Sequence, residues 1–224
     1  MQRHFDEQIQ ELLRKLVLMA RLADSMIGLA LRMLLERNEK YCEEVKSKEE
    51  ELDRLMVEVD EWAIKLTALQ QPVGSDVRFL FMASRIGSEL ERIGDKAVTM
   101  CKNSRELIKA PLLKPLVDLP IMAEVVQKML GNAIESLVKR DLALADLVLN
   151  EEEKVNAFRE RIFRELLTYM MTDANAIPRA LALILISRNL KRVGDHATNI
   201  AEEVIYLVKG RDVRHQKDAP AGGA

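Results

Sequence analysis

Two strings of the sequence, 100 residues apart, repeat the same order of residue types. The first, ERIGDKAVTM, occupies residues 91–100, and the second, KRVGDHATNI, occupies residues 191–200. Both contain an arginine, an aliphatic residue, a glycine, an aspartate, any residue and an alanine, and the aspartates are separated by 195 − 95 = 100 positions. Chance rarely repeats five matched positions within 224 residues. We therefore expect an internal duplication that gives two similar units.

Each half of the chain contains three stretches in which apolar residues recur every three or four positions, the spacing of one helix face. Strong helix formers dominate the composition, and only nine glycines and six prolines interrupt it. The sequence predicts an all-α fold of two tandem three-helix bundles. In the first half we expect helices from Phe5 to about Glu36, from an N-cap at Asn38 to Gln71, and from Ser75 to before Pro111. In the second half we expect one helix that begins near Ile121, one that includes residues 148–169, and one that begins near Pro178 and ends at Gly210.

A proline-rich segment separates the two units. The string KAPLLKPLVDLP, residues 109–120, holds three prolines, which interrupt helical geometry. The polar string that follows Gly210 is typical of a flexible tail. We expect a first three-helix repeat at 1–110, a linker at 111–120, a second repeat at 121–210 and a tail at 211–224.

The charge balance and the apolar runs exclude several classes of protein. With 34 basic and 36 acidic side chains the formal net charge is −2, so no basic field would hold a nucleic acid. The longest apolar run, residues 180–186, is far shorter than the roughly 18 residues that cross a bilayer. The N-terminal string MQRHFDEQIQ lacks a signal-peptide core. We expect a cytoplasmic protein without membrane insertion.

The sequence gives no support for catalysis. Cys42 and Cys101 fall among helical residues without a partnered base, and no glycine-rich loop for phosphate is evident. A di-iron carboxylate enzyme needs two Glu-x-x-His elements, and none of the three histidines has a glutamate three positions earlier. We expect a protein that is not an enzyme.

The repeated string places carboxylates together on one helix edge. Glu91 and Asp95 are four residues apart, and like charges at that spacing repel unless a cation compensates them. That cation is either a neighbouring basic side chain or a metal. The corresponding edge of the second unit holds Lys191, Asp195, Asn199 and Glu203, in which the lysine can neutralise Asp195 directly. We also expect the helical glycines, Gly94 and Gly194, to let another helix approach closely.

Four strings of the sequence resemble those of a known protein family. The strings QPVGSDVR at 71–78, LERIGDKA at 90–97, LLTYMMTD at 166–173 and LKRVGDHATNIAEEVIYLVKG at 190–210 resemble PhoU, a family of bacterial phosphate-signalling regulators. The resemblance spans nearly the whole chain, in the family's order and with its duplicated plan.

The resemblance implies a negative regulator of the phosphate-starvation response and of phosphate uptake. Its implied partners are a phosphate-specific ABC transporter and a phosphate-sensing histidine kinase, and we also expect a homodimer that meets the membrane only through partners. Some members carry iron or other divalent or trivalent metals on E/DxxxD motifs, which here map onto Glu91 and Asp95. In the second repeat Lys191 replaces the usual acid, so we expect metal to favour the first repeat. We assign partner binding to Arg78, Arg92 and Arg192, and expect no tight binding of free phosphate.

Two other functions remain open from sequence. One is a metal-binding helical protein that uses the E/DxxxD carboxylates of both repeats, namely Glu91, Asp95, Asp195, Asn199 and Glu203. The other is a helical scaffold unrelated to phosphate.

Overall fold

The computed structural model describes residues 2–210, with side chains from Phe5 onward; the expected tail at 211–224 lies outside the described residues. Within that range the chain forms six long α-helices, one 3₁₀ turn at Ala174–Ala176 and no β-strand, which confirms the all-α prediction. The helices are α1 Gln2–Glu36, α2 Lys40–Gln70, α3 Ser75–Leu107, α4 Asp118–Lys139, α5 Leu142–Thr172 and α6 Ile177–Lys209.

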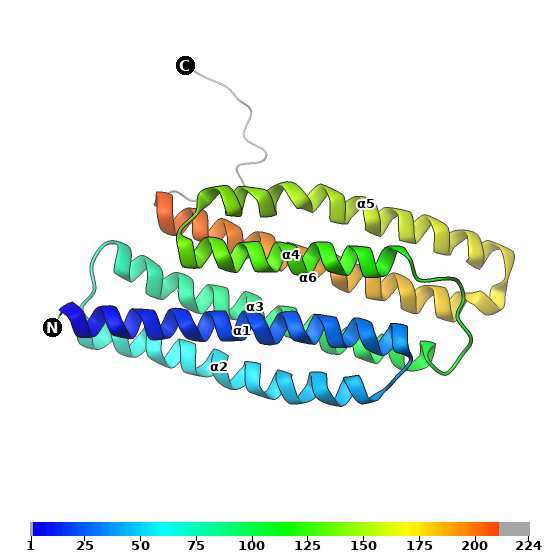
Figure 1. The fold of residues 1–224 in the computed structure, drawn as a ribbon, viewed down its shortest axis with the longest axis horizontal. Helices are drawn as coiled ribbons and strands as arrows, with labels where there is room; N and C mark the ends of the chain where they lie inside the picture. Colours follow the sequence, from blue (N-terminus) through cyan, green and yellow to red (C-terminus); the bar gives the residue numbers. More distant parts are fainter. Residues whose placement is uncertain (1, 211–224) are drawn as a thin grey trace, which may run out of the picture.

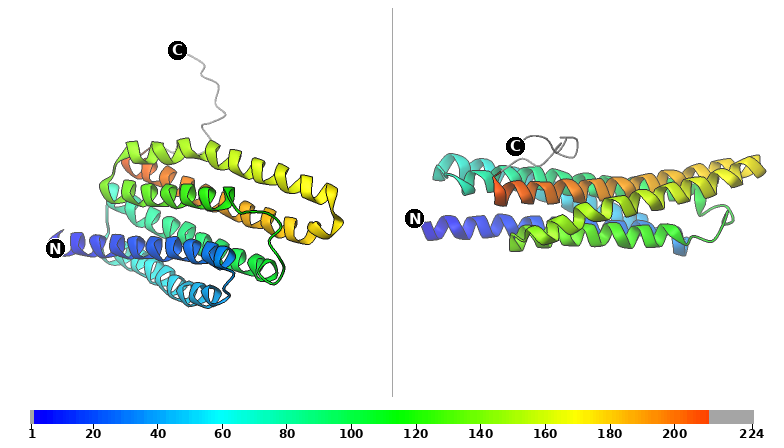
Figure 2. Two further views of the ribbon diagram at one scale, coloured as in Figure 1. Left: turned by 45° about the vertical axis from the view of Figure 1, so that its right-hand side comes forward. Right: turned by 90° about the horizontal axis from the view of Figure 1, so that it is seen from above.

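The two three-helix bundles lie side by side with their long axes nearly parallel (Figure 1). Helices α1 to α3 form the first bundle and α4 to α6 the second, and the most extensive contact between any two helices joins α3 to α6. Helix α1 also contacts α4. Seen from above, α3 and α6 share one layer while α1 and α4 share the other (Figure 2). Four helices therefore form the seam between the bundles, and α2 and α5 lie on the outside.

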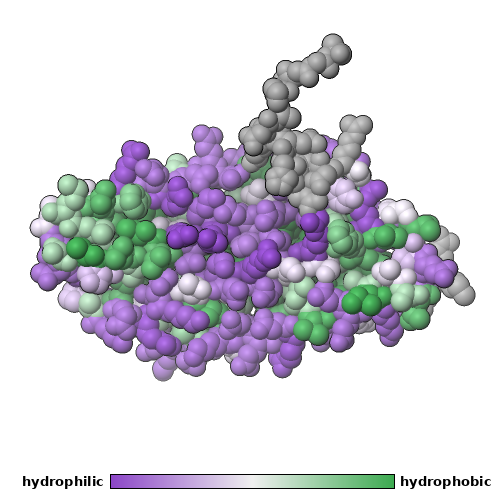
Figure 3. All heavy atoms as spheres, turned by 180° about the vertical axis from the view of Figure 1, so that it is seen from behind, coloured by the Kyte–Doolittle hydropathy of each residue, from purple (hydrophilic) through white to green (hydrophobic). Residues whose placement is uncertain are grey.

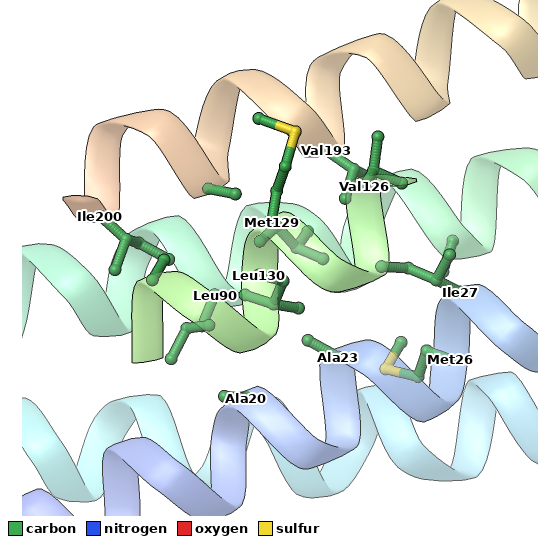
Figure 4. Packing of buried hydrophobic residues seen from close by; sticks show 14 of the residues in the cluster. Ala20, Ala23, Met26, Ile27, Leu90, Val126, Met129, Leu130, Val193 and Ile200 are labelled. Carbon is green, nitrogen blue, oxygen red and sulfur yellow. The ribbon is translucent and has the colours of Figure 1, made fainter. Parts of the chain in front are cut away.

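The buried side chains of both bundles form one continuous cluster. Figure 4 shows its centre, where small residues of α1, Ala20 and Ala23, allow Leu130 of α4 to approach. A polar contact fixes the same pair of helices, because Nε2 of Gln127 donates to Oδ1 of Asp24 at 2.9 Å. The repeats thus share a core as well as a plan.

The turns that begin α2 and α5 are equivalent. Arg37 and Arg140 end the preceding helices with the same left-handed backbone, φ 54°. Oδ1 of Asp141 then accepts hydrogen bonds from two backbone amides of α5. Oδ1 of Asn38 similarly accepts a hydrogen bond from the backbone amide of Lys40 at 3.1 Å. Helix α2 nevertheless begins later than expected, because the residue directly before it is Glu39 and not Asn38.

Helix α4 begins at Asp118, before the expected end of the linker. Pro120 belongs to its first turn, where the missing N–H of proline removes no intrahelical hydrogen bond. Pro178 occupies the first turn of α6, and Gly210 ends that helix with φ 69°, as the sequence predicts. No helix within residues 2–210 is both long and apolar enough to cross a membrane.

Candidate functional site

The carboxylates of the first repeat gather between α2 and α3. Glu91 and Asp95 share one edge of α3, and two acids from α2, Glu49 and Asp53, lie close enough to act on them electrostatically. We call these four residues the acidic cluster. The α2 pair was not predicted from the sequence, although Glu49 and Asp53 have the same ExxxD spacing within the string EEELD.

Mutual repulsion acts throughout the acidic cluster. Burial, followed by the charges of neighbouring acids, raises the pKa of Glu49, of Asp53 and of Glu91 above their ordinary values. Asp95 is among the charges that raise each of these three pKa values. Lys102 acts against this shift at Glu49, and Arg92 and Lys96 act against it at Glu91, but all three pKa values stay raised. The cluster therefore carries an excess of negative charge, which is the electrostatic condition that favours cation binding.

The donor chemistry of the acidic cluster suits a hard cation, whereas its present geometry does not enclose one. Carboxylate oxygens are the ligands that such ions prefer. Among the described side chains, however, no three acids, histidines or cysteines converge closely enough to hold a metal ion. Ligation would therefore require these side chains to move together, with water or a partner completing the coordination.

The second repeat has lost this charge excess. Lys191 lies where α3 has Glu91, and its Nζ pairs with Oδ1 of Asp195 at 2.6 Å. On the adjacent helix Asn156 replaces Asp53 as the repeat equivalent. The two repeats thus differ in their side-chain contacts, because Lys191 pairs with the shared aspartate in the second repeat, whereas other carboxylates surround it in the first.

Asn199 and Glu203 belong to the seam rather than to this carboxylate edge. Nδ2 of Asn199 donates to Oε2 of Glu89 at 2.8 Å, and Glu203 pairs with Arg85 at 3.1 Å. Both contacts join α6 to α3. The structure therefore does not bring Asn199 and Glu203 together with Asp195 around one point.

The seam contacts line a polar cleft of about 500 Å³ between α3 and α6. The side chain of His196, on α6, is only 14% exposed, and its Nδ1 lies 2.8 Å from Oε2 of Glu89. Burial alone would raise the pKa of Glu89, but hydrogen bonds with His196 and Asn199 outweigh it and hold that pKa below its ordinary value. This side of the cleft is thus a satisfied network that fixes one bundle against the other.

The three arginines assigned to partner binding do not converge. Arg78 crosses the seam, where its Nη1 donates to the carbonyl of Leu207 at 3.1 Å and its guanidinium lies over the Tyr206 ring. Arg92 pairs with Glu89 at 3.1 Å, whereas Arg192 is exposed on α6. Arg78 and Arg92 are 14 residues apart on the same helix, which separates them by about 21 Å along its axis, so the three arginines do not meet in one anion pocket.

Comparison with known proteins gives a consistent result for most of the chain. Residues 16–104 and 119–204 each match the PhoU domain. A Pseudomonas aeruginosa protein named "Phosphate-specific transport system accessory protein PhoU homolog" is 32% identical over 94% of this chain and 88% of its own length. A relative from Aquifex aeolicus with the same name is 33% identical over 94% of this chain and 95% of its own length.

Solved structures have the same architecture. The crystal structure of PhoU from Pseudomonas aeruginosa is 31% identical, covers 92% of this chain and 100% of its own, and superimposes with a TM-score of 0.88. The phosphate transport system regulatory protein PhoU from Streptococcus pneumoniae shares the fold at 22% identity, with a TM-score of 0.85 over 93% of this chain and 99% of its own. Because both repeats match the same domain and together span most of the sequence, this chain belongs to the PhoU family.

Proposed function

We propose that this protein is a cytoplasmic negative regulator of the phosphate-starvation response and of phosphate uptake. In this proposal it couples a phosphate-specific ABC transporter to a phosphate-sensing histidine kinase and performs no catalysis. The observation that carries the proposal is the match of both repeats to the PhoU domain, together with relatives named as accessory proteins of phosphate-specific transport.

The surface supports a role in binding other proteins. Figure 3 shows hydrophilic side chains over the middle of one face and apolar side chains gathered toward both ends. At the α2–α3 end Ile64 is 70% and Phe81 60% exposed, and both line an apolar groove of about 670 Å³. Exposed apolar patches of this kind commonly mark interaction sites. The internal duplication gives an adaptor two related units with which to contact two partners.

Gene deletion tests the regulatory half of the proposal. In cells grown with abundant phosphate, deletion should switch on a phosphate-starvation reporter and raise phosphate uptake, and the plasmid-borne gene should reverse both effects. An unchanged reporter in the deletion strain would contradict a regulatory role and favour the unrelated-scaffold alternative.

Affinity capture from phosphate-replete cells tests the adaptor half. Tagged protein should retain subunits of the phosphate transporter and the sensor kinase, both identified by mass spectrometry. Arg192→Glu, which changes an exposed arginine of α6, should weaken capture, whereas Arg140→Glu at the α4–α5 turn is the matched control. Capture of neither partner by the unchanged protein would overturn the adaptor role.

Two further parts of the proposal concern assembly and phosphate. We propose a homodimer, which light scattering of the purified protein should detect as twice the mass of one chain.

Free phosphate should not bind tightly, because the arginines considered above do not converge on one point. Calorimetry that shows micromolar phosphate binding would contradict this second part.

Metal binding is the second candidate function, and the acidic cluster favours it. Iron or another divalent or trivalent cation would be held by Glu91 and Asp95 with help from α2, and would relieve their repulsion. Elemental analysis of protein purified without chelators tests the idea. Asp95→Ala should lower metal content far more than Asp195→Ala, because Lys191 already neutralises Asp195. Equal loss from both variants, or no metal in the parent, would contradict it.

A further inference from the structure

The chain's two cysteines meet between α2 and α3. Glu39 pairs with Arg105 at one end of this antiparallel pair of helices, and Asp60 accepts a hydrogen bond from Ser84 farther along. This register sets Cys42 opposite Cys101, close enough for the Cys42 sulfur to act on the Cys101 thiol. Both thiols are reduced and buried. The sequence contains no other cysteine, so each thiol has one possible intramolecular partner.

The surroundings of the two sulfurs differ in ways that matter for oxidation. Cys42 is the third residue of α2, so fraying of the first helical turn exposes it. Its Sγ accepts a hydrogen bond from Nη2 of Arg105 at 3.6 Å, which places a positive charge beside it. Burial, with the neighbouring Cys42 sulfur as the second cause, raises the pKa of Cys101 to about 12, so Cys101 stays a neutral thiol.

We propose that Cys42 and Cys101 form a peroxide-oxidisable dithiol that closes into an intramolecular disulfide between α2 and α3. In the first step the Cys42 sulfur attacks hydrogen peroxide, which leaves a sulfenic acid on Cys42 and releases one water. In the second step the Cys101 sulfur attacks the Cys42 sulfur. The sulfenic hydroxyl departs with the Cys101 proton as a second water. Two thiols lose two electrons in total, and peroxide is reduced to two waters.

The disulfide has a structural consequence for the acidic cluster. Cys42 and Cys101 lie on the same two helices as Glu49, Asp53, Glu91 and Asp95, so the bond ties together the pair that carries the cluster. It also closes a long loop that contains most of α2 and α3, and closing long loops lowers the entropy of the unfolded chain. In a reducing compartment such a bond is transient, as expected of a redox-sensitive site.

Peroxide treatment of the reduced, full-length protein tests the proposal. The product should be lighter by the mass of two hydrogens, should have no alkylatable thiol after denaturation, and should return to the starting mass with dithiothreitol. Digestion without reductant should give one peptide pair joined through Cys42 and Cys101. The thermal midpoint should rise by about 5 °C or more in the oxidised form.

Three single variants test the steps. In Cys101→Ala the sulfenic acid has no partner, so dimedone should trap it on Cys42. In Cys42→Ala the remaining buried thiol should stay unmodified at the same peroxide dose. Arg105→Gln should slow the oxidation of Cys42 at least several-fold without preventing it. Far-UV circular dichroism checks that each variant is folded. If a variant does not fold, the mass of the oxidised parent protein still tests the proposal.

Three results would overturn the proposal. The first is a parent protein in which dimedone labels Cys42 while Cys101 remains a free thiol. The second is a disulfide that joins two chains in place of the intramolecular bond. The third is a parent protein whose two thiols both survive peroxide at doses that oxidise a small thiol completely.

Discussion

Gly94 and Gly194 occupy equivalent positions but different surroundings. A Cβ at Gly94 would lie 2.5 Å from Cδ2 of the buried Leu52 and 3.3 Å from Cε of Met26. A Cβ at Gly194 would meet Val155 at 3.5 Å and Val126 at 3.6 Å, which are ordinary contacts. The expectation that glycine admits a neighbouring helix therefore holds for the first repeat, while the second has room for a methyl group.

Alanine at these two glycines should change stability in opposite directions. Alanine gains about 1 kcal/mol over glycine in a helix interior, so Gly194→Ala should raise the free energy of unfolding by up to that amount. Gly94→Ala receives the same gain but crowds Leu52, and overpacking costs about 1–3 kcal/mol. Urea denaturation of both variants measures the difference. Equal stabilisation of the two would show that Leu52 moves aside freely.

The repeated aspartates should likewise give opposite results. Because the pKa values of Glu49, Asp53 and Glu91 are raised in the folded protein, protonation of these carboxylates favours the folded state. This contribution to stability is fully present below the ordinary carboxylate pKa. That contribution is lost as the pH rises through the raised values. Asp95→Asn removes a charge that acts on all three, so it should stabilise the protein at pH 7 by a few tenths of a kcal/mol. Near pH 4 the gain should disappear.

Asp195→Asn is the matched control for this effect. It breaks the Lys191–Asp195 pair and should lower stability at pH 7 by roughly 0.3–0.5 kcal/mol. Thermal unfolding of both variants at the two pH values supplies the comparison. The same sign for both at pH 7 would contradict the electrostatic difference between the repeats.

At the scale of the elements, the linker between α3 and α4 is held by side chains from both bundles. Nη2 of Arg37 donates to the carbonyls of Ile108 and Ala110 at 2.5 and 2.7 Å. From the second bundle, Arg161 forms a two-pronged pair with Asp118 at 2.6 Å, and Glu165 pairs with the buried Lys114. The proline-rich segment is thereby fixed in place against both bundles.

Removal of Arg37 should loosen this segment. Arg37→Ala leaves two linker carbonyls without their donor, so hydrogen exchange and proteolytic cleavage in residues 108–117 should increase several-fold. Arg140→Ala is the control, because Arg140 has the same positive φ at the equivalent turn and lies far from the linker in the fold. Similar exchange in the linker of both variants would show that the Arg37 hydrogen bonds do not hold it.

The helices could be read from the sequence because each buries one apolar stripe, and its period appears within a single stretch of chain. The partners of a helix edge leave no such pattern. Glu49 and Asp53 were missed because only the packing of α2 on α3 brings them to Glu91 and Asp95. Likewise, the register between α3 and α6 directs Asn199 and Glu203 toward Glu89 and Arg85.

At the scale of the whole molecule, we expect the shared core to make the two repeats unfold as one cooperative unit. Buried residues of α1, α3, α4 and α6 meet at the seam (Figure 4). Separating the bundles would expose this apolar surface to water at about 25 cal/mol per Å². Residues 1–110 alone should therefore aggregate or lose helicity, although their helices are all present.

The chain's one tryptophan makes this cooperativity measurable in the intact protein. Trp62 lies in α2, so its fluorescence reports on the first bundle, whereas far-UV circular dichroism reports on all six helices. The two signals should change at the same denaturant concentration.

Leu166→Ala, which removes a fully buried side chain of α5, should cost about 2–5 kcal/mol and shift the Trp62 transition as far as the loss of helicity. Leu167→Ala removes a neighbouring side chain that is 40% exposed and should shift both far less. A Trp62 transition that stays in place while helicity is lost in two steps would mean that the seam does not couple the bundles.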